Sequence, residues 1–237
     1  VRLGLTNIAL WDMDTVSPHN LANQIFRQQD IGRSKVEALA DILFDINPDV
    51  KDDLKLYKDG WNGQQLSGYV FLCVDNIELR KKIVEKHFDN PYVKAMFDFR
   101  TLLEAGQHYA ADWSDYKMKK DLLNSMNFTH DEAAEETPVS ACGITLGVVT
   151  TVRVICALGV SNFVKYIRGK GLNKLIICDA FQPLVGAVLV SKRTKGGVRY
   201  GHDRWCSQSR CTTRDGQVRC GQRQPVPDCL AERKSKL

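Results

Sequence analysis

The sequence predicts an α/β fold: a doubly wound, Rossmann-like sheet, mostly parallel, with helices on both faces. Short apolar segments alternate with segments of helical periodicity, several apolar segments end in an acidic residue, and 43% of the residues are hydrophobic. Apolar strands of this kind are typical of sheets that helices cover on both faces. The 237 residues suffice for one large domain, and the composition excludes collagen-like, coiled-coil and fully disordered chains.

The expected elements follow one another as strand, helix, strand, helix. In chain order they are a strand at 7–12, a helix at 36–46, a strand at 69–74, a helix at about 77–87, a strand at 93–97, a helix at 147–168 and a strand at 175–178. The strands are short and mainly apolar, and we expect the first to be a buried parallel strand. The helices repeat apolar residues every three or four positions.

Two of the helices carry clear boundary signals. Ser34 and Glu37 form a capping-box pattern at the start of the helix at 36–46, and the Asn-Pro pair at 47–48 ends it. The segment 147–168 is apolar nearly all round, which predicts a buried helix, and the glycines at 169 and 171 end it. No run of 18 apolar residues is uninterrupted and no secretory signal is visible, so we expect no membrane span and a cytoplasmic protein.

The last part of the chain differs in composition from the rest. Residues 183–237 hold 12 Lys and Arg against 4 Asp and Glu, with few large apolar side chains. We therefore expect one domain over residues 1–182 and a disordered basic tail over 183–237. Four of the eight cysteines lie in this tail without a C-x-x-C pair, which disfavours zinc. Nucleic acid binding is expected, if at all, only through phosphate contacts of this tail.

Acidic residues follow three of the expected strands. Ligands bind at the carboxyl ends of strands in doubly wound sheets, so Asp12, Asp75 and Asp98 are expected to line one crevice. A carboxylate in the position of Asp12 or Asp14 can accept hydrogen bonds from ribose, although this pair equally fits a turn cap. Asp75 offers the hard oxygen that Mg²⁺ prefers, and Asp75 with Asn76 also fits a helix N-cap, a role that can coexist with magnesium binding.

Lys35 lies in the first turn of its expected helix, where the helix dipole disfavours a cation, so an anionic partner is indicated. The four histidines at 19, 87, 108 and 130 show no metal or triad spacing, and we expect surface or turn positions for them.

Several ordered motifs resemble the ThiF/MoeB/HesA adenylyltransferases, the superfamily that includes the ubiquitin-activating enzymes. They are LWDMDTVSPHNL at 10–21, Gln24, DIGRSKVEA at 30–38, INP at 46–48, VDN at 74–76 and GVV at 147–149. The resemblance covers roughly residues 1–182. It implies an enzyme that uses ATP and Mg²⁺ to adenylate a carboxylate, typically the C-terminus of a ubiquitin-like or sulfur-carrier protein, and that forms a homodimer.

The resemblance also implies roles for individual residues. Asp12 would bind ribose, Lys35 would contact phosphate, and Asp75 would hold magnesium. The implied cofactor-binding residues are Asp12, Asp14, Asn20, Gln24, Lys35 and Asn76. Catalysis would rest on Lys35 and Asp75, because neutralising charge as a carboxylate meets a phosphate needs no side-chain nucleophile.

The sequence also departs from the family pattern. Asn23 stands where the family has an arginine, and Arg27 or Arg33 is a candidate to replace it. The G-x-G-x-x-G loop that cradles phosphate in the family does not occur. We therefore expect an N-terminally truncated domain lacking its first strand and glycine loop, with an inactive fragment as one alternative.

One cysteine is a candidate nucleophile. Some relatives form a thioester or persulfide before the long helix, and Cys142 lies near that place, flanked by glycine. A buried structural thiol is the alternative, and we expect that role for Cys73, Cys156 and Cys178.

Three other functions remain open. A dehydratase of the same family would activate a carboxylate on modified tRNA, and a noncatalytic subunit would scaffold an active homologue. A nicotinamide-dependent dehydrogenase is the third, since a doubly wound fold does not fix function.

Overall fold

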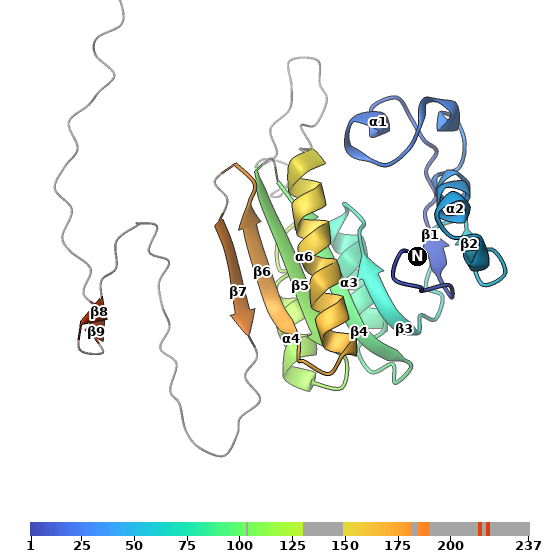
Figure 1. Ribbon diagram of the computed structural model, residues 1–237. Coiled ribbons are helices and arrows are strands. Elements are labelled where there is room, and N and C mark those ends of the chain that lie inside the picture. Colours follow the sequence, from blue (N-terminus) through green and yellow to red (C-terminus); the bar gives the residue numbers. More distant parts are fainter. Residues whose placement is uncertain (103, 130–148, 182–183, 190–212, 215–216, 219–237) are drawn as a thin grey trace, which may run out of the picture. The chain divides into compact units, whose positions relative to one another are not determined.

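The computed structural model describes residues 1–102, 104–129, 149–181, 184–189, 213–214 and 217–218 (Figure 1). The chain divides into two compact units, Val1–Ser191 and Lys192–Leu237. In the second unit, β8 (Thr213–Arg214) and β9 (Gln217–Val218) pair antiparallel. All other elements belong to the first unit.

The first unit is built on a five-stranded mixed sheet in the order β3-β4-β5-β6-β7. Its strands are β3 (Gly68–Leu72), β4 (Val93–Thr101), β5 (Ala105–Asp112), β6 (Asn173–Asp179) and β7 (Leu184–Leu189). β3 and β4 are parallel, as are β1 (Ala9–Trp11) and β2 (Lys55–Tyr57), which form a separate pair. The pairs from β4 to β7 are antiparallel. The predicted α/β class is confirmed, and the antiparallel pairing of β4 with β5 follows from their short connection, which cannot make a parallel crossover.

Helices cover both faces of this sheet (Figure 1). The long helix α6 (Val149–Ile167) crosses one face, while α3 (Ile77–Lys86) and α4 (Tyr116–Asn124) lie on the other. Consecutive residues of β4 alternate between these layers, since Phe97 contacts Phe163 of α6 at 5.5 Å between ring centroids and Asp98 pairs with Arg80 of α3. Between β1 and β2 lie α1 (Asn20–Asn23), η1 (Gln28–Asp30), α2 (Lys35–Ile46) and η2 (Pro48–Val50).

Most of the predicted elements are present. The strands at 7–12, 69–74, 93–97 and 175–178 correspond to β1, β3, β4 and β6, and the predicted helices correspond to α2, α3 and α6. β2, β5, α4 and β7 were not predicted. Among the described residues, no helix combines the length and the apolar character needed to cross a bilayer.

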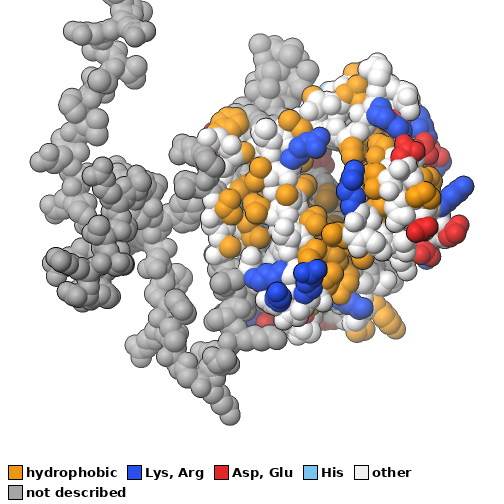
Figure 2. Space-filling view, viewed as in Figure 1, with side chains coloured by type: hydrophobic (Ala, Val, Ile, Leu, Met, Phe, Trp, Pro, Cys, Tyr) orange, Lys and Arg blue, Asp and Glu red, His pale blue; other side chains and the backbone are white. Residues whose placement is uncertain are grey.

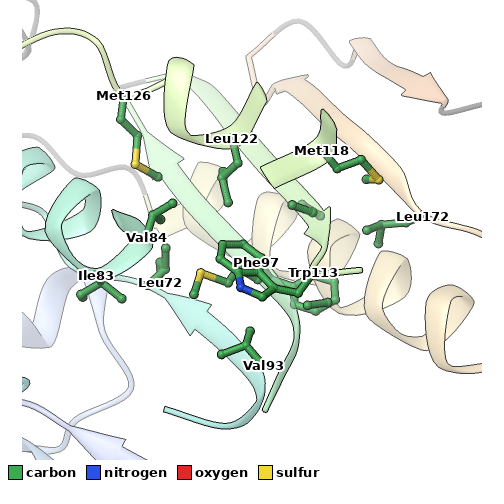
Figure 3. Close-up of a cluster of buried hydrophobic side chains, with 14 of the residues drawn as sticks. Leu72, Ile83, Val84, Val93, Phe97, Trp113, Met118, Leu122, Met126 and Leu172 are labelled. Atoms are coloured by element: carbon green, nitrogen blue, oxygen red, sulfur yellow. The ribbon is translucent and has the colours of Figure 1, made fainter. Parts of the chain in front are cut away.

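A single hydrophobic cluster joins the sheet to its helices (Figure 3). Phe97 and Met96 at the centre of β4 are fully buried, and Trp113, Met118, Leu122 and Met126 close the cluster from the side of α4. The cluster fixes α3 and β4 against each other, and this places the residues that follow β3.

Two expectations about burial are wrong. β1 is not buried, because among the described strands it pairs only with the three-residue β2, and Ala9 is exposed. α6 exposes Val154, Val160 and Ile167, although its sequence is apolar nearly all round. The described sheet covers only the face of α6 that carries Ile155 and Phe163, so the other face stays at the surface.

The start of α2 is held by the backbone and not by the predicted capping box. The Ser34 side chain makes no cap hydrogen bond, and Glu37 instead forms an ion pair with Lys58. The Lys35 N–H donates to the Asp14 carbonyl at 2.9 Å, and Thr15 and Ser34 form an antiparallel bridge. The chain just after β1 is thereby fixed beside the first turn of α2.

Close contact between α6 and the sheet depends on Gly159. A Cβ atom at this position would lie 2.2 Å from Cε1 of Phe99 and 3.3 Å from Nδ1 of His108. We expect Gly159→Ala to lower the free energy of unfolding by about 1–3 kcal/mol through overpacking. Urea denaturation measures the loss, with Ser161→Ala, at an exposed position of the same helix, as the control. A Gly159→Ala variant as stable as that control would contradict the close packing.

Candidate functional site

The residues after β1 form a compact polar cluster with the first turn of α2. The Asp14 N–H donates to Oδ1 of Asp12 at 2.9 Å, and Nζ of Lys35 donates to Oδ2 of Asp14 at 2.7 Å. The Lys35 side chain is 15% exposed and that of Asp14 is 62% exposed. The structure thus brings the predicted ribose and phosphate ligands Asp12, Asp14 and Lys35 together.

The next two predicted phosphate-site residues lie in and after α1. Asn20 is buried, and its Oδ1 accepts hydrogen bonds from the Ser17 N–H and the Ser17 hydroxyl, both at 2.9 Å. Its amide oxygen therefore holds the turn before α1. Gln24 follows the helix with an exposed side chain, and its N–H donates to the Asn20 carbonyl at 2.8 Å.

Both arginines that could replace the family arginine at Asn23 are paired with carboxylates. Buried Asp30 lies 3.1 Å from Nε of Arg27 and 3.3 Å from Nη1 of Arg33. Arg27 also pairs with Asp45 and Arg33 with Asp41. The hydrogen bond from Arg27 lowers the pKa of Asp30, so this carboxylate stays charged. The two guanidinium groups thus stabilise the loop that leads into α2.

Asp75 and Asn76 lie between β3 and α3, as predicted. Oδ1 of Asn76 accepts a hydrogen bond from the Leu79 N–H at 2.7 Å, so Asn76 is the N-cap of α3. Asp75 is exposed, and its carboxylate is of the ligand type that Mg²⁺ prefers. No cluster of three or more His, Cys, Asp or Glu suited to a metal occurs in the described part of the chain.

The cluster after β1 and the residues between β3 and α3 are not linked directly. In the part of the chain that the structure describes, no hydrogen bond or ion pair joins Asp12, Asp14 or Lys35 to Asp75 or Asn76. A ligand such as a nucleotide would have to bridge them.

Asp98 does not line a crevice, contrary to the expectation. β4 continues to Thr101, and the fully buried Asp98 carboxylate accepts hydrogen bonds from Arg80 and from Nε of Arg100, the latter at 2.7 Å. Two guanidinium groups thus compensate one carboxylate inside the protein. Sequence reasoning missed Arg80, although its spacing from Ile77 and Val84 places it on the buried face of α3.

The histidine expectation is wrong for His108, which lies within β5, whereas His87 lies in the turn that follows α3, as expected. His87 and His108 are fully buried, whereas His19 is exposed and His130 lies outside the described residues. Nδ1 of His108 donates to the Asp98 carbonyl at 3.1 Å, and its Nε2 accepts from Nδ2 of Asn162 at 3.2 Å. These bonds require the neutral ring, and burial lowers the pKa of His108 to about 4.

This buried histidine predicts a loss of stability in acid. The pKa of His108 falls from 6.5 to about 4 on folding, so its stabilisation is complete above pH 6.5 and is lost as the pH falls toward 4. Between pH 7 and pH 5, His108 should lower the free energy of unfolding by about 2 kcal/mol. Urea denaturation of wild type and His108→Gln at both pH values isolates this contribution. An equal fall in the two proteins would contradict the prediction.

The described cysteines offer no activated thiol. Cys178 is buried as expected, but Cys73 and Cys156 keep exposed surface, so the expectation is wrong for those two. Desolvation raises the pKa of Cys73 to about 11 and also raises the pKa values of Cys156 and Cys178. The candidate nucleophile Cys142 lies outside the described residues.

Comparison with known proteins gives both a family match and a fold match. The ThiF family model matches residues 1–197. Ubiquitin-like modifier-activating enzyme 5 from Caenorhabditis briggsae is 32% identical over 97 residues, which are 35% of this chain and 22% of that protein. The chain therefore spans about a fifth of this curated relative.

Similar solved structures cover more of the chain at lower identity. Escherichia coli MccB with ATP has a TM-score of 0.54 at 14% identity, covering 76% of this chain and 55% of MccB. MccB with MccA-N7isoASN has a TM-score of 0.57 at 13% identity, covering 76% and 56%. PaaA has a TM-score of 0.50 at 13% identity, covering 77% and 63%. At these identities the likeness shows the fold alone, and it confirms the Rossmann-type class.

Proposed function

Because the chain belongs to the ThiF family, we propose that it is the nucleotide-binding part of an adenylyltransferase that uses ATP and Mg²⁺. Its substrate would be the C-terminal carboxylate of a ubiquitin-like or sulfur-carrier protein. The observation that carries the proposal is the cluster after β1, where Lys35 lies 2.7 Å from Asp14 and Asp14 is bonded to Asp12. A cation and ribose-type hydrogen-bond acceptors thus occur together at the carboxyl end of a parallel strand.

The comparisons support the nucleotide and the ubiquitin-like carrier in this proposal. The curated relative is named as a ubiquitin-like modifier-activating enzyme, and MccB has been solved both with ATP and with MccA. A nucleotide and a polypeptide substrate are the two reactants that adenylation of a carrier terminus requires.

The reaction places strong demands on charge neutralisation. A carboxylate oxygen of the carrier attacks the α-phosphorus of ATP, the bond between the α-phosphorus and the bridging oxygen breaks, and pyrophosphate leaves. Two anions approach each other in this step, so cations and positioning supply most of the catalysis. When bound, Mg²⁺ would neutralise the phosphates, with Asp75 as its protein ligand.

The residues near β1 would bind the remainder of the nucleotide. Asp12 would accept hydrogen bonds from the ribose hydroxyls, with Asp14 beside it. The Lys35 ammonium would exchange its hydrogen bond to Asp14 for one to a phosphate oxygen. Asn20, Gln24 and Asn76 would border the phosphates, although Asn20 and Asn76 each use their amide oxygen within the fold.

Phosphate binding also needs backbone N–H groups of the kind that a glycine loop supplies. In the described residues, β1 pairs only with β2 and β3 only with β4, so each strand has a free edge. We propose that a parallel strand carrying a glycine loop pairs at these edges. Its loop would then lie near Asp12 and Asp75, since the carboxyl ends of neighbouring parallel strands meet at one edge of the sheet.

We further propose a homodimer that forms through the outer face of α6. Val154, Val160 and Ile167 are 37–46% exposed there, and Figure 2 shows hydrophobic side chains on this face of the molecule. We expect Val160→Lys to shift sedimentation equilibrium from dimer to monomer by placing unpaired charges in the interface. Lys170→Glu, beyond the end of the helix, is the control. A Val160→Lys variant with the same mass as wild type would contradict this interface.

Isotope exchange between pyrophosphate and ATP tests the adenylation itself. We expect exchange that requires Mg²⁺ and a carrier with a free C-terminal carboxylate, and none with the same carrier amidated at its C-terminus. Stimulation by modified tRNA in place of a carrier would favour the dehydratase. Nucleotide binding without turnover would favour the scaffold, and NADH binding without ATP binding would favour the dehydrogenase.

A further inference from the structure

Helix α3 begins two residues after the proposed magnesium ligand Asp75 and is anchored in its first turn by a buried ion pair. Asn76 caps the helix, and the Arg80 N–H donates to the Asn76 carbonyl at 3.2 Å. The Arg80 guanidinium then bonds the Asp98 carboxylate, with side-chain exposures of 7% and 0%. The residue next to Asp75 is therefore tied through one helical turn to an ion pair inside the protein.

The Asp98 carboxylate is itself held from its other side. Its second oxygen accepts from Nε of Arg100 at 2.7 Å, and Arg100 donates to the Ser125 carbonyl and hydroxyl at 2.8 and 2.9 Å. The Arg100 guanidinium also lies 4.4 Å from the centroid of the Tyr109 ring. Asp98 is thus a fixed point to which α3 is attached.

The register between β3 and β4 places Asp98 beside the last residue of β3. Leu72, the last residue of β3, is the partner of Asp98 across the parallel pair. Asp75 follows only three residues later, so Arg80 and Asp98 hold α3 at the level where the chain leaves the sheet.

A contribution to folding stability alone does not explain why Asp98 and Arg80 form a buried ion pair. Replacing a buried ion pair by apolar side chains of similar volume is often neutral or stabilising, because desolvation offsets the attraction. What the pair supplies here is a defined geometry, since the planar guanidinium allows few arrangements around a carboxylate.

We propose that Arg80 is a positioning residue that orients the Asp75 carboxylate for the metal–nucleotide complex by fixing the first turn of α3 on Asp98. The inference rests on the proposed function for the role of Asp75. The attachment itself is independent of it, and the two can be tested separately.

Arg80→Met is the informative substitution, because methionine keeps an unbranched apolar stem while Asp98 stays paired with Arg100. Lys174→Met is the matched control, since it removes a cation from an ion pair with Asp121 that joins β6 to α4 at 2.6 Å. Arg80→Lys retains the charge without the guanidinium and should rescue part of the effect. It also serves as the test variant if Arg80→Met does not fold.

Hydrogen exchange of the protein without ligands tests the attachment. We expect Arg80→Met to accelerate amide exchange about tenfold at the first turn of α3, including the Leu79 N–H, with α4 and α6 unchanged. Lys174→Met should leave α3 at the wild-type rate. Unchanged exchange at α3, or acceleration spread evenly over the unit, would overturn the proposal.

Titration with ATP and Mn²⁺, followed by electron paramagnetic resonance, tests the orientation of Asp75. A lost supporting contact of this kind should weaken Mn²⁺–ATP binding about 10–100-fold in Arg80→Met and leave Lys174→Met at the wild-type affinity. Wild-type affinity in Arg80→Met would overturn the positioning role. If the wild-type protein binds no Mn²⁺–ATP, the proposed function fails, and the exchange experiment still decides whether Arg80 fixes α3.

Discussion

Asp98→Ala is expected to lower the free energy of unfolding by about 3–5 kcal/mol, because it leaves two buried guanidinium groups without their carboxylate. The side chains of Arg80 and Arg100 are only 7% and 14% exposed, so water cannot fully replace the lost partner. Loss of the carboxylate also removes the ion pair between α3 and β4. Urea denaturation followed by circular dichroism measures the change.

Asp121→Ala is the control for Asp98→Ala. Asp121 also pairs with a cation, Lys174, but both side chains are about 30% exposed. An ion pair so accessible to water contributes only about 0–1 kcal/mol. Losses of similar size in the two variants would show that Asp98 is better hydrated than its burial indicates.

Asp75→Ala is expected to reduce carrier-dependent exchange of pyrophosphate into ATP about 10²–10³-fold, because the metal would lose its protein ligand. Asp75 is exposed, so the free energy of unfolding should change by less than about 0.5 kcal/mol. The effect would therefore appear in activity and in Mn²⁺–ATP binding but not in stability.

Asp89→Ala tests whether this effect is specific. Asp89 is another acidic residue beside α3, 93% exposed, at the opposite end of the helix from Asp75. It should retain wild-type exchange. Undiminished exchange in Asp75→Ala itself would refute the magnesium role.

The spacing of apolar residues in the sequence was sufficient to predict the helices and strands whose buried side chains recur at that spacing. α2 and α3 have apolar residues at helical spacing, and β3 is a continuous apolar run, so each was predicted close to its observed bounds. β5 was missed because it is rich in small and polar residues, among them Gly106 and His108, which are buried by α6 and the neighbouring strands. Such tertiary packing overrides strand propensity.

The candidate site likewise has residues whose positions the sequence predicted and residues whose partners it did not predict. The resemblance assigned Asp12, Asp14 and Lys35 to nucleotide binding, and the structure brings them together because the chain after β1 pairs with the start of α2. The fate of Asp98 was not predictable, since its partner Arg80 lies 18 residues earlier and on another element. The pairing of Arg27 and Arg33 with Asp30 likewise depends on the fold of the loop before α2.

The outer position of β3 has a consequence for handling the protein. Residues 68–74 contain no charged residue and no proline, and Tyr69 and Phe71 are 39% and 41% exposed. Proteins usually protect outer strands with charge or proline, because bare strands recruit other molecules into β-structure. We therefore expect concentrated samples of residues 1–237 to precipitate slowly, and a single lysine in place of the exposed Tyr69 to keep them soluble.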